Sequence, residues 1–392
     1  MRLINFSGIA DKRNVYFILL LIIISLISIA LSGKINYSDP KYSNMDFNKY
    51  VEMAEAAPGI NLNIPQPFVF RILVPWLGGI LPFSIAINFY FMSITFQLLF
   101  VILLYHFLVF HSIEKNIAFA LSVCFIFNRY FFQSFSWDYF QAGDVLSNAI
   151  ILAMFFLIVK KRWFMFSFIF LLGIFVRETV LLILPLGYFM LLRKLKFKED
   201  ILFFTAASII PVAIFVSSRI LMSNQVGENL VNQFISGATD IFTAKVLIKK
   251  FIIAFTPFGL IPIIFPKETL KFFRERFYLF VYFAGVIFAS FFGDYERLMY
   301  PSAPVYYLLI SFIVQTYVIN EKDKQTLIFI GTIIFISFLS SFYHLWGIFT
   351  FPDRDVTIVS TIVLLIVTAL LFVRLKIQRN KIDLSAVPSS FK

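Results

Sequence analysis

Long apolar runs, separated by short polar segments, make up most of the chain. A transmembrane helix needs about 20 mostly apolar residues to cross roughly 30 Å of hydrocarbon. The pattern therefore predicts an all-α fold, a polytopic helix bundle with about twelve spans in a range of about ten to thirteen. The expected spans are residues 15–32, 84–110, 116–130, 144–159, 163–176, 179–192, 201–221, 246–265, 277–292, 298–319, 326–346 and 356–373. The first could be mistaken for a signal peptide, but the spans that follow it favour an anchor helix.

One stretch, residues 163–192, decides the number of spans. Arg177 and Glu178 lie at its middle, and both of its flanks, 160–162 and 193–196, are basic. A single helix would put one basic cluster on each side of the membrane, whereas a hairpin keeps both on the cytoplasmic side. We therefore expect two short helices. Because lipid cannot solvate charged groups, their tip should lie in protein or in a water-filled recess that opens outward.

Composition narrows the class of protein. The residues are 60% hydrophobic and 14% charged, with 54 phenylalanines, whereas about a quarter of an ordinary soluble domain is charged. This excludes a soluble enzyme, a disordered chain and a disulfide-stapled secreted domain. The single cysteine, Cys124, excludes a multi-cysteine metal site, and only three histidines make a histidine-cluster site improbable.

The net charge of +12 is explained by topology. With the first residue in the cytoplasm, most lysines and arginines fall on inner segments, which predicts an even number of spans with both termini in the cytoplasm. No nucleic-acid partner is needed to account for the basic charge. We expect one polytopic membrane domain over residues 1–392, with outer loops at 33–68 and 222–245 and a cytoplasmic tail at 374–392.

The first outer loop is expected to carry an amphipathic helix. In segment 45–54, MDFNKYVEMA, apolar residues recur at i, i+3, i+4 and i+7 from Phe47, which is helical spacing along a membrane surface. Asp46 and Tyr50 are i, i+4 neighbours on an adjacent face. Asp46 is either a cap and dipole partner of this helix or a functional carboxylate.

Arginines on the expected outer side form the next group of candidates. Arg71 lies in PQPFVFRILVPWL, where three prolines predict a bent backbone near the membrane surface. There it either snorkels or holds a lipid phosphate by a bidentate contact. Arg177 and Glu178, at membrane depth, are functional candidates by default. The alternative is a mutual ion pair that tightens the hairpin.

Two further outer segments contain acidic residues. The turn FGDYERLMYPSAP carries Asp294, Glu296 and Arg297, for which a solvated local salt bridge is the alternative explanation. Asp138, flanked by aromatic residues, faces a polar ligand or belongs to a capped loop, and Asp144 is expected to cap the helix that follows it. All of these residues fall on one side of the predicted membrane, so we expect any chemical site to face outward.

Glycosyl transfer from a lipid-linked sugar fits this set. The donor phosphate needs cationic side chains that stabilise the leaving group, and the acceptor hydroxyl needs a carboxylate as general base. The predicted site comprises Asp46 as base and Arg71, Arg177 and Arg297 as phosphate ligands, supported by Tyr50, Asp138, Glu178, Asp294 and Glu296. No cofactor or resident metal is assigned, and a need for a divalent metal is left open.

The segments MDFNKYVEMA, PFVFRILVPWL, GIFVRETVLLILP and GDYERLMYPSAP resemble those of bacterial GT-C membrane glycosyltransferases. The resemblance implies an essential acid in the first outer loop, which matches Asp46, and a polyprenyl-phosphate sugar as donor. It also implies the bacterial cytoplasmic membrane, membrane lipids as surroundings and a glycan or lipid as acceptor. The chain departs from better-known members because Phe47, not a second acid, follows Asp46, and because no large C-terminal soluble domain is evident.

Three other interpretations remain. A flippase or transporter of lipid-linked saccharides would use the same arginines, but should have ionisable groups or broken helices near the midplane. The uncharged runs 298–319 and 325–352 argue against an inner gate of that kind. An O-antigen polymerase or ligase would also use outer arginines, usually within one large loop late in the chain. A purely structural membrane protein would not explain why the charges gather on one side.

Overall fold

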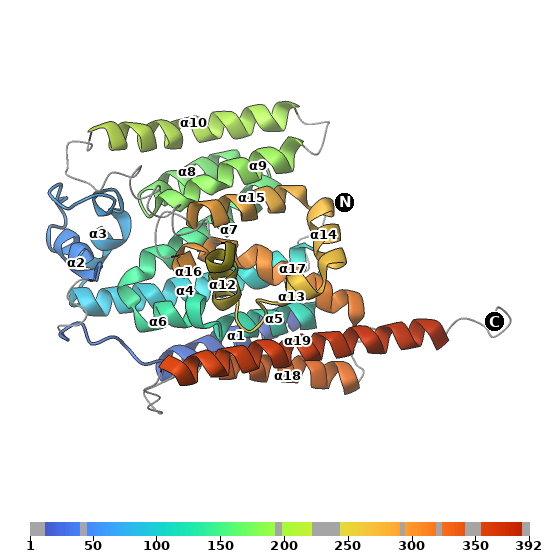
Figure 1. The fold of residues 1–392 in the computed structure, drawn as a ribbon. Helices are drawn as coiled ribbons and strands as arrows, with labels where there is room; N and C mark the ends of the chain where they lie inside the picture. The colour runs from blue at the N-terminus through green and yellow to red at the C-terminus, as the bar shows by residue number, and fades with distance from the viewer. Residues whose placement is uncertain are drawn as a thin grey trace.

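A computed structural model describes residues 12–39, 45–192, 198–221, 244–290, 295–318, 324–341 and 354–385. Across these ranges every regular element is a helix and none is a strand. The predicted all-α class is confirmed. The long helices run roughly alongside one another and form a bundle, with several short helices set across them (Figure 1).

Five helical segments are long and apolar enough to cross a membrane. They comprise α1 (Lys12–Leu31), α4 (Ile85–Phe110), α7 (Ala142–Val159) with the preceding 3-10 turn η5 (Tyr139–Gln141), α10 (Lys198–Leu221) and the apolar part of α19 (Arg354–Ser385). The protein is therefore a helical membrane protein. The number of twelve crossings stays a prediction, because the other expected spans correspond to shorter or interrupted helices.

Two expected spans are interrupted, so their prediction as continuous helices is wrong. Residues 116–130 fall on α5 (Lys115–Ile126), which is followed by the π-helical turn η4 (Arg129–Gln133) and α6 (Ser134–Trp137) at an angle of 49°. The expected span 246–265 becomes two helices, α12 (Ala244–Ala254) and α13 (Ile261–Ile264). Pro257 lies in the gap between them and has no amide hydrogen to continue the helical ladder.

The predicted break at the middle of residues 163–192 is confirmed. Helix α8 (Trp163–Ile174) ends before Arg177, whose backbone is extended, and the chain continues as η6 (Glu178–Leu182) and α9 (Ile183–Leu192). Gly173 makes the close return possible, because a Cβ atom there would lie 2.8 Å from Val180 Cγ1.

The expected helix of the first outer loop is present as α2 (Phe47–Glu55), with Tyr50 and Ala54 buried. After the 3-10 turn η3 (Phe68–Phe70), the chain forms α3 (Leu73–Ile80). Helix α2 packs closely on α3, where a Cβ on Gly79 would lie 2.0 Å from the Ala54 carbonyl oxygen. The apolar face of α2 is thus buried against protein, and the predicted bend before α3 is confirmed.

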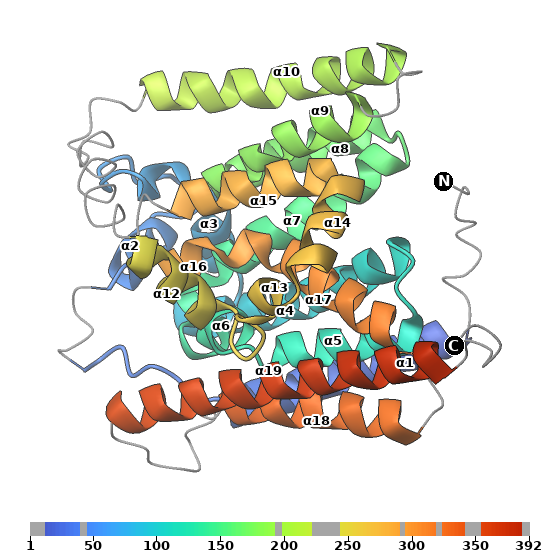
Figure 2. The same cartoon turned by 45° about the vertical axis from the view of Figure 1, so that its right-hand side comes forward.

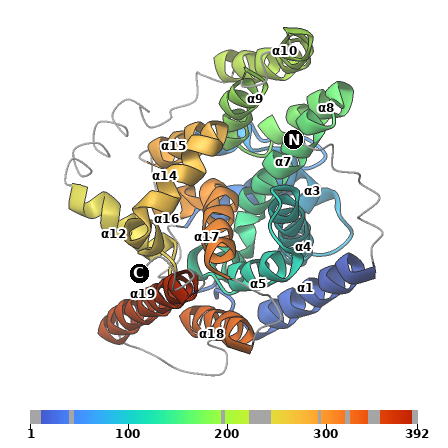
Figure 3. The same ribbon diagram turned by 90° about the vertical axis from the view of Figure 1, so that its right-hand side faces the viewer.

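The remaining helices complete the bundle. They are α14 (Pro266–Glu275), α15 (Phe277–Ala289), α16 (Tyr295–Leu298), the 3-10 turn η8 (Tyr300–Ser302), α17 (Ala303–Tyr317) and α18 (Lys324–Ser340). Helices α4, α7 and α17 lie at the centre, between α8–α10 on one flank and α1, α18 and α19 on the other (Figure 3). Helix α1 begins and α19 ends at one end of the bundle, opposite the end that carries α2 and α3 (Figure 2).

Candidate functional site

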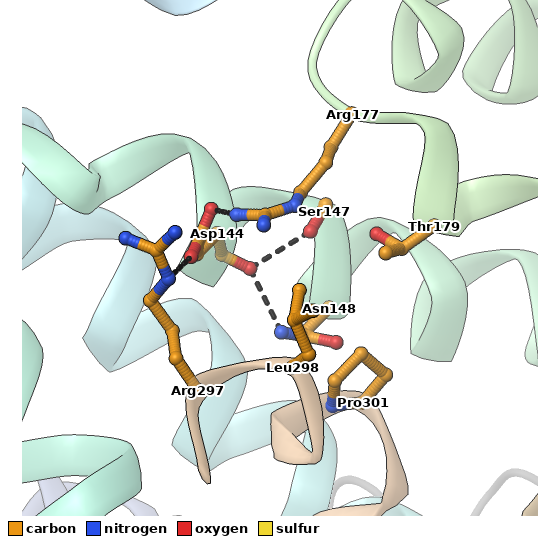
Figure 4. Close-up of a pocket in the computed structure, with 8 residues that line it drawn as sticks. All are labelled: Asp144, Ser147, Asn148, Arg177, Thr179, Arg297, Leu298 and Pro301. Atoms are coloured by element: carbon orange, nitrogen blue, oxygen red, sulfur yellow. Dashed lines mark hydrogen bonds and ion pairs between the residues drawn. The ribbon is translucent and has the colours of Figure 1, made fainter. Parts of the chain in front are cut away.

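The end of the bundle that carries α2 brings together charges from four separate segments. Asp144, in the first turn of α7, contacts the guanidinium of Arg177 at the break after α8. Arg297 of α16 approaches it from the other side, with 3.6 Å between Arg297 Nε and Asp144 Oδ2 (Figure 4). Arg297 also lies near α2, with 3.8 Å between its Nη1 and Asp46 Oδ2. Sequence-predicted Asp46, Arg177 and Arg297 therefore belong to one cluster.

Burial differs strongly within this cluster. The Asp144 and Arg177 side chains are 6% and 5% exposed, whereas those of Asp46 and Arg297 are 26% and 24% exposed. A buried charge is stable only when it is paired, so Asp144 and Arg177 require each other. Asp46 lies at the rim, where Lys49 Nζ is 3.5 Å from its Oδ1. It makes no side-chain capping hydrogen bond to α2, and the interpretation of Asp46 as a simple cap is not supported.

A second charged cluster, formed by Arg71, Glu178 and Arg219, adjoins the first. Arg71 donates two hydrogen bonds to Glu178, from Nε to Oε2 at 3.3 Å and from Nη2 to Oε1 at 2.5 Å. Arg219, near the end of α10, lies 3.8 Å from Glu178 Oε2, and its guanidinium is 3.6 Å from the ring centre of Phe70. Burial alone would lower the pKa of Arg71, but the charge of Glu178 raises it above its ordinary value.

The two clusters are joined through the consecutive residues Arg177 and Glu178. Because successive side chains of an extended segment point to opposite sides, Arg177 turns to Asp144 while Glu178 turns to Arg71. The alternative of a mutual Arg177–Glu178 pair that tightens the hairpin is wrong. Each residue instead ties the hairpin to a different part of the fold.

Asp138 supports the segment that carries Asp46. It is buried in the turn between α6 and η5 and accepts a hydrogen bond from the Tyr37 hydroxyl at 2.9 Å. The Tyr37 ring packs against Phe47 at the start of α2 and against Phe140. Burial raises the pKa of the Asp138 carboxyl above its ordinary value. Asp138 thus acts as an internal partner, in agreement with the loop interpretation rather than with direct ligand contact.

Three predicted supporting residues remain. Tyr50 is buried in α2 and packs edge-on against Phe68, and it contributes to the electrostatic environment of Arg71. Asp294 and the side chain of Glu296 lie outside the described residues.

A small pocket opens beside the Asp144 cluster, with room for about one water molecule. This is far smaller than a site that encloses a drug-sized ligand, and it suits a single water-sized polar group. The lining residues are Asp144, Ser147, Asn148, Arg177, Thr179, Arg297, Leu298 and Pro301. Within the described part of the chain, no group of three His, Cys, Asp or Glu side chains could hold a metal ion.

Sequence reasoning missed two members of the clusters. Asp144 was expected only as a helix cap, and Arg219 was not considered. One signal was available for each, because Asp144 is the only charged residue in 139–159 and Arg219 the only one in 201–221. An isolated charge inside an apolar span is costly and points to a partner elsewhere in the fold.

Comparisons with protein-family models, with curated proteins and with solved structures found no match for this chain.

Proposed function

We propose that this protein is a GT-C-type membrane glycosyltransferase that moves a sugar from a polyprenyl-phosphate donor to a glycan or lipid acceptor. The observation that carries the proposal is the convergence of Arg177, Arg297 and two carboxylates beside a small polar pocket at one end of an apolar bundle. A lipid-linked donor lies in the membrane, so an ionic site at the end of the helices can meet its phosphate while its chain stays among apolar surfaces.

The proposed reaction requires cationic groups at the phosphate. The acceptor oxygen bonds to the anomeric carbon while the bond from that carbon to the phosphate oxygen breaks, and polyprenyl phosphate departs. The phosphate gains negative charge in this step. Guanidinium groups of Arg177 and Arg297 would stabilise the developing charge most strongly in a site with little water. Arg71, in the adjoining cluster, is the third candidate and shares its partner Glu178 with Arg219 of α10.

Asp46 is the better candidate for the general base that takes the acceptor proton. Asp144 is buried and both of its oxygens already face guanidinium groups, so an acceptor hydroxyl cannot reach it without displacing an arginine. Asp46 is partly exposed, is separated from Arg297 by 3.8 Å, and stands on the side that an acceptor reaches first. Asp144 would then hold the arginines in position.

The proposed orientation places this site outside the cytoplasm, with both termini inside. The end of the bundle where α1 begins and α19 ends also carries α14, with the exposed basic residues Lys267, Lys271 and Arg274 (Figure 2). A basic end agrees with the positive-inside rule. The bacterial cytoplasmic membrane and the twelve crossings are part of the same proposal.

A turnover assay tests the function. Purified protein would be mixed with a panel of polyprenyl-phosphate hexoses and lipid or glycan acceptors, and release of polyprenyl phosphate would be followed by mass spectrometry. Asp46→Asn should lose at least 100-fold in rate, a typical contribution of general base catalysis, while it retains donor binding. Glu52→Gln changes an exposed carboxylate of the same helix and should be fully active. Full activity in Asp46→Asn would remove Asp46 as base, and no turnover with any donor would count against the enzyme itself.

Arg71→Ala separates phosphate binding from catalysis. It should weaken binding of polyprenyl phosphate roughly tenfold, as expected for the loss of a charge-assisted contact. Arg374→Gln, an exposed arginine at the opposite end, is the control. Equal affinities of the two variants would exclude Arg71 from the phosphate site.

A transporter of lipid-linked saccharides is the second candidate. The observation that favours it is that the interruption after α5 and the one after α12 are in contact inside the bundle. Helix α5 has 12 residues, about 18 Å, so its end falls within the hydrocarbon core. Asn128, just after α5, donates from Nδ2 to the carbonyls of Ala254 and Thr256, both at 3.3 Å, at the gap after α12. Discontinuous helices of this kind line transport paths. Movement of a fluorescent lipid-linked sugar across proteoliposomes without chemical turnover would favour transport.

A further inference from the structure

Helix α14, at the opposite end of the bundle from the ionic clusters, separates its residues onto two faces. On one face Phe272 is fully buried, and Glu268 accepts a hydrogen bond from the Tyr317 hydroxyl of α17, so this face packs on protein. The opposite face is exposed and consists of Lys267, Leu270, Lys271 and Arg274, at i, i+3, i+4 and i+7. Figure 1 shows that α14 is set across the end of the bundle, not along it. This is the placement of a helix that lies in the plane of a membrane surface.

The three cations of the exposed face of α14 have no ion-pair partner within the described part of the chain. Other cations at this end of the bundle do have one. Lys161 Nζ lies 2.8 Å from Asp200 Oδ2, and Arg276 Nη1 lies 3.4 Å from Glu275, the acid nearest to the exposed face. The face therefore presents three positive charges, along about 10 Å of helix, that the described protein does not neutralise.

Apolar side chains are exposed beside these charges. Leu270 lies among the cations and is 71% exposed. Directly after α14, Phe277 and Phe280 of α15 are 50% and 43% exposed, and their ring centres are 5.9 Å apart. The ring of Phe189, from α9, extends the same strip, with 5.8 Å between its centre and that of Phe277. Exposed apolar surface is unfavourable in water but favourable at a membrane surface, where it enters the acyl region while the cations stay among the headgroups.

We propose that the exposed face of α14 binds anionic phospholipid in the membrane leaflet on its side of the bundle. The lipid phosphates contact the three cations, and the acyl chains lie along Leu270, Phe277 and Phe280. A zwitterionic lipid carries no net charge to balance the cations, so the face prefers anionic lipid. The site is independent of the proposed function, because it shares no residue with the ionic clusters at the other end.

The experiment places a fluorescent label at Leu270→Cys in the full chain, where labelling is selective because the single native cysteine, Cys124, is buried. The protein is reconstituted in vesicles of phosphatidylcholine and phosphatidylglycerol with matched acyl chains. In one preparation the phosphatidylglycerol carries brominated chains, which quench the label, and in the other the phosphatidylcholine carries them at the same mole fraction. One Lys or Arg near the surface raises affinity for anionic lipid roughly fivefold. The label should therefore report at least about a fivefold enrichment of phosphatidylglycerol, and high salt should reduce it.

Two triple variants separate the exposed face of α14 from the net charge of the protein. Changing the three cations of this face to Gln should abolish the enrichment. The control changes to Gln three exposed cations at the same end on other helices, Lys198, Lys324 and Arg374 (Figure 2). It has the same net charge as the first triple variant and should keep the enrichment. Equal quenching by both lipids in the labelled parent, or equal losses in the two triple variants, would overturn the site, because the cations would then face water or act only through the net charge.

Discussion

Asp144→Asn tests whether the arginine cluster depends on one buried carboxylate. At the 3.6 Å between Arg297 Nε and Asp144 Oδ2, an effective dielectric constant of about 20 gives an attraction of about 5 kcal/mol. The Arg297 side chain is 24% exposed, so solvent reduces its net contribution to about 1 kcal/mol. The Arg177 side chain is only 5% exposed, and removing the partner of a buried charge costs about 3–5 kcal/mol. We expect Asp144→Asn to lower the free energy of unfolding by at least about 3 kcal/mol.

The assay is unfolding of the purified protein in mixed micelles with increasing sodium dodecyl sulfate, followed by tryptophan fluorescence. Asp200→Asn is a matched control, because Asp200 is also a buried first-turn carboxylate, but its partner Lys161, at 2.8 Å, is 51% exposed. Loss of that pair should cost less than about 1 kcal/mol. The double variant Asp144→Asn with Arg177→Met removes the stranded charge and should be more stable than Asp144→Asn alone.

Two results would refute this reasoning. If Asp144→Asn is as stable as Asp200→Asn, the buried pair does not hold the hairpin tip to α7. If the double variant loses the sum of both single losses, the two residues are energetically independent and the cluster is not a coupled unit.

The remaining predictions concern burial and backbone packing. Since burial raises the pKa of Asp138, its charged form is disfavoured in the folded state. Asp138→Asn can still accept a hydrogen bond from Tyr37, so this variant should be at least as stable as the wild type at pH 7. The gain in stability should shrink as the pH falls through the raised pKa of the Asp138 carboxyl. A loss of stability at pH 7 that shrinks at low pH would contradict this sign. Gly173→Ala should cost about 1–3 kcal/mol in the same unfolding assay, since its Cβ would lie 2.8 Å from Val180. Gly331 lies in α18, and a Cβ atom there would have no other atom within 4 Å. Gly331→Ala should therefore gain up to about 1 kcal/mol of stability from helix propensity. Equal effects of alanine at the two glycines would refute the packing argument.

Several features of this protein could be predicted from local sequence. The apolar runs require helices in a membrane, because only hydrogen-bonded helices or closed barrels satisfy the backbone in lipid. The periodicity from Phe47 predicts α2, and the charges at Arg177 within basic flanks predict the break between α8 and α9. These signals are local, since each depends on residues that are neighbours along the chain.

Other features needed the tertiary structure. The interruption after α12 has a local signal in Pro257, whereas no proline marks the one after α5. Only the fold brings the two interruptions together, where Asn128 donates to the carbonyls of Ala254 and Thr256, far away in sequence. The alternative of a mutual Arg177–Glu178 pair was wrong for a related reason. An extended backbone sends the two side chains to opposite sides, where each meets a stronger partner.

The candidate site, too, could be predicted only in part from the sequence. Sequence alone determined that the charges are few and lie near the ends of apolar runs, and it predicts that they gather on one side of the membrane. Only the packing of α7, α16 and the hairpin decided which charges pair and that Asp144 lies at their centre. The physical reason is that two free energies decide whether a buried charge is stable. The desolvation cost depends on the burial of the residue itself, which local hydropathy predicts. The compensating attraction comes from charged side chains that are distant in sequence and are brought close only by the fold.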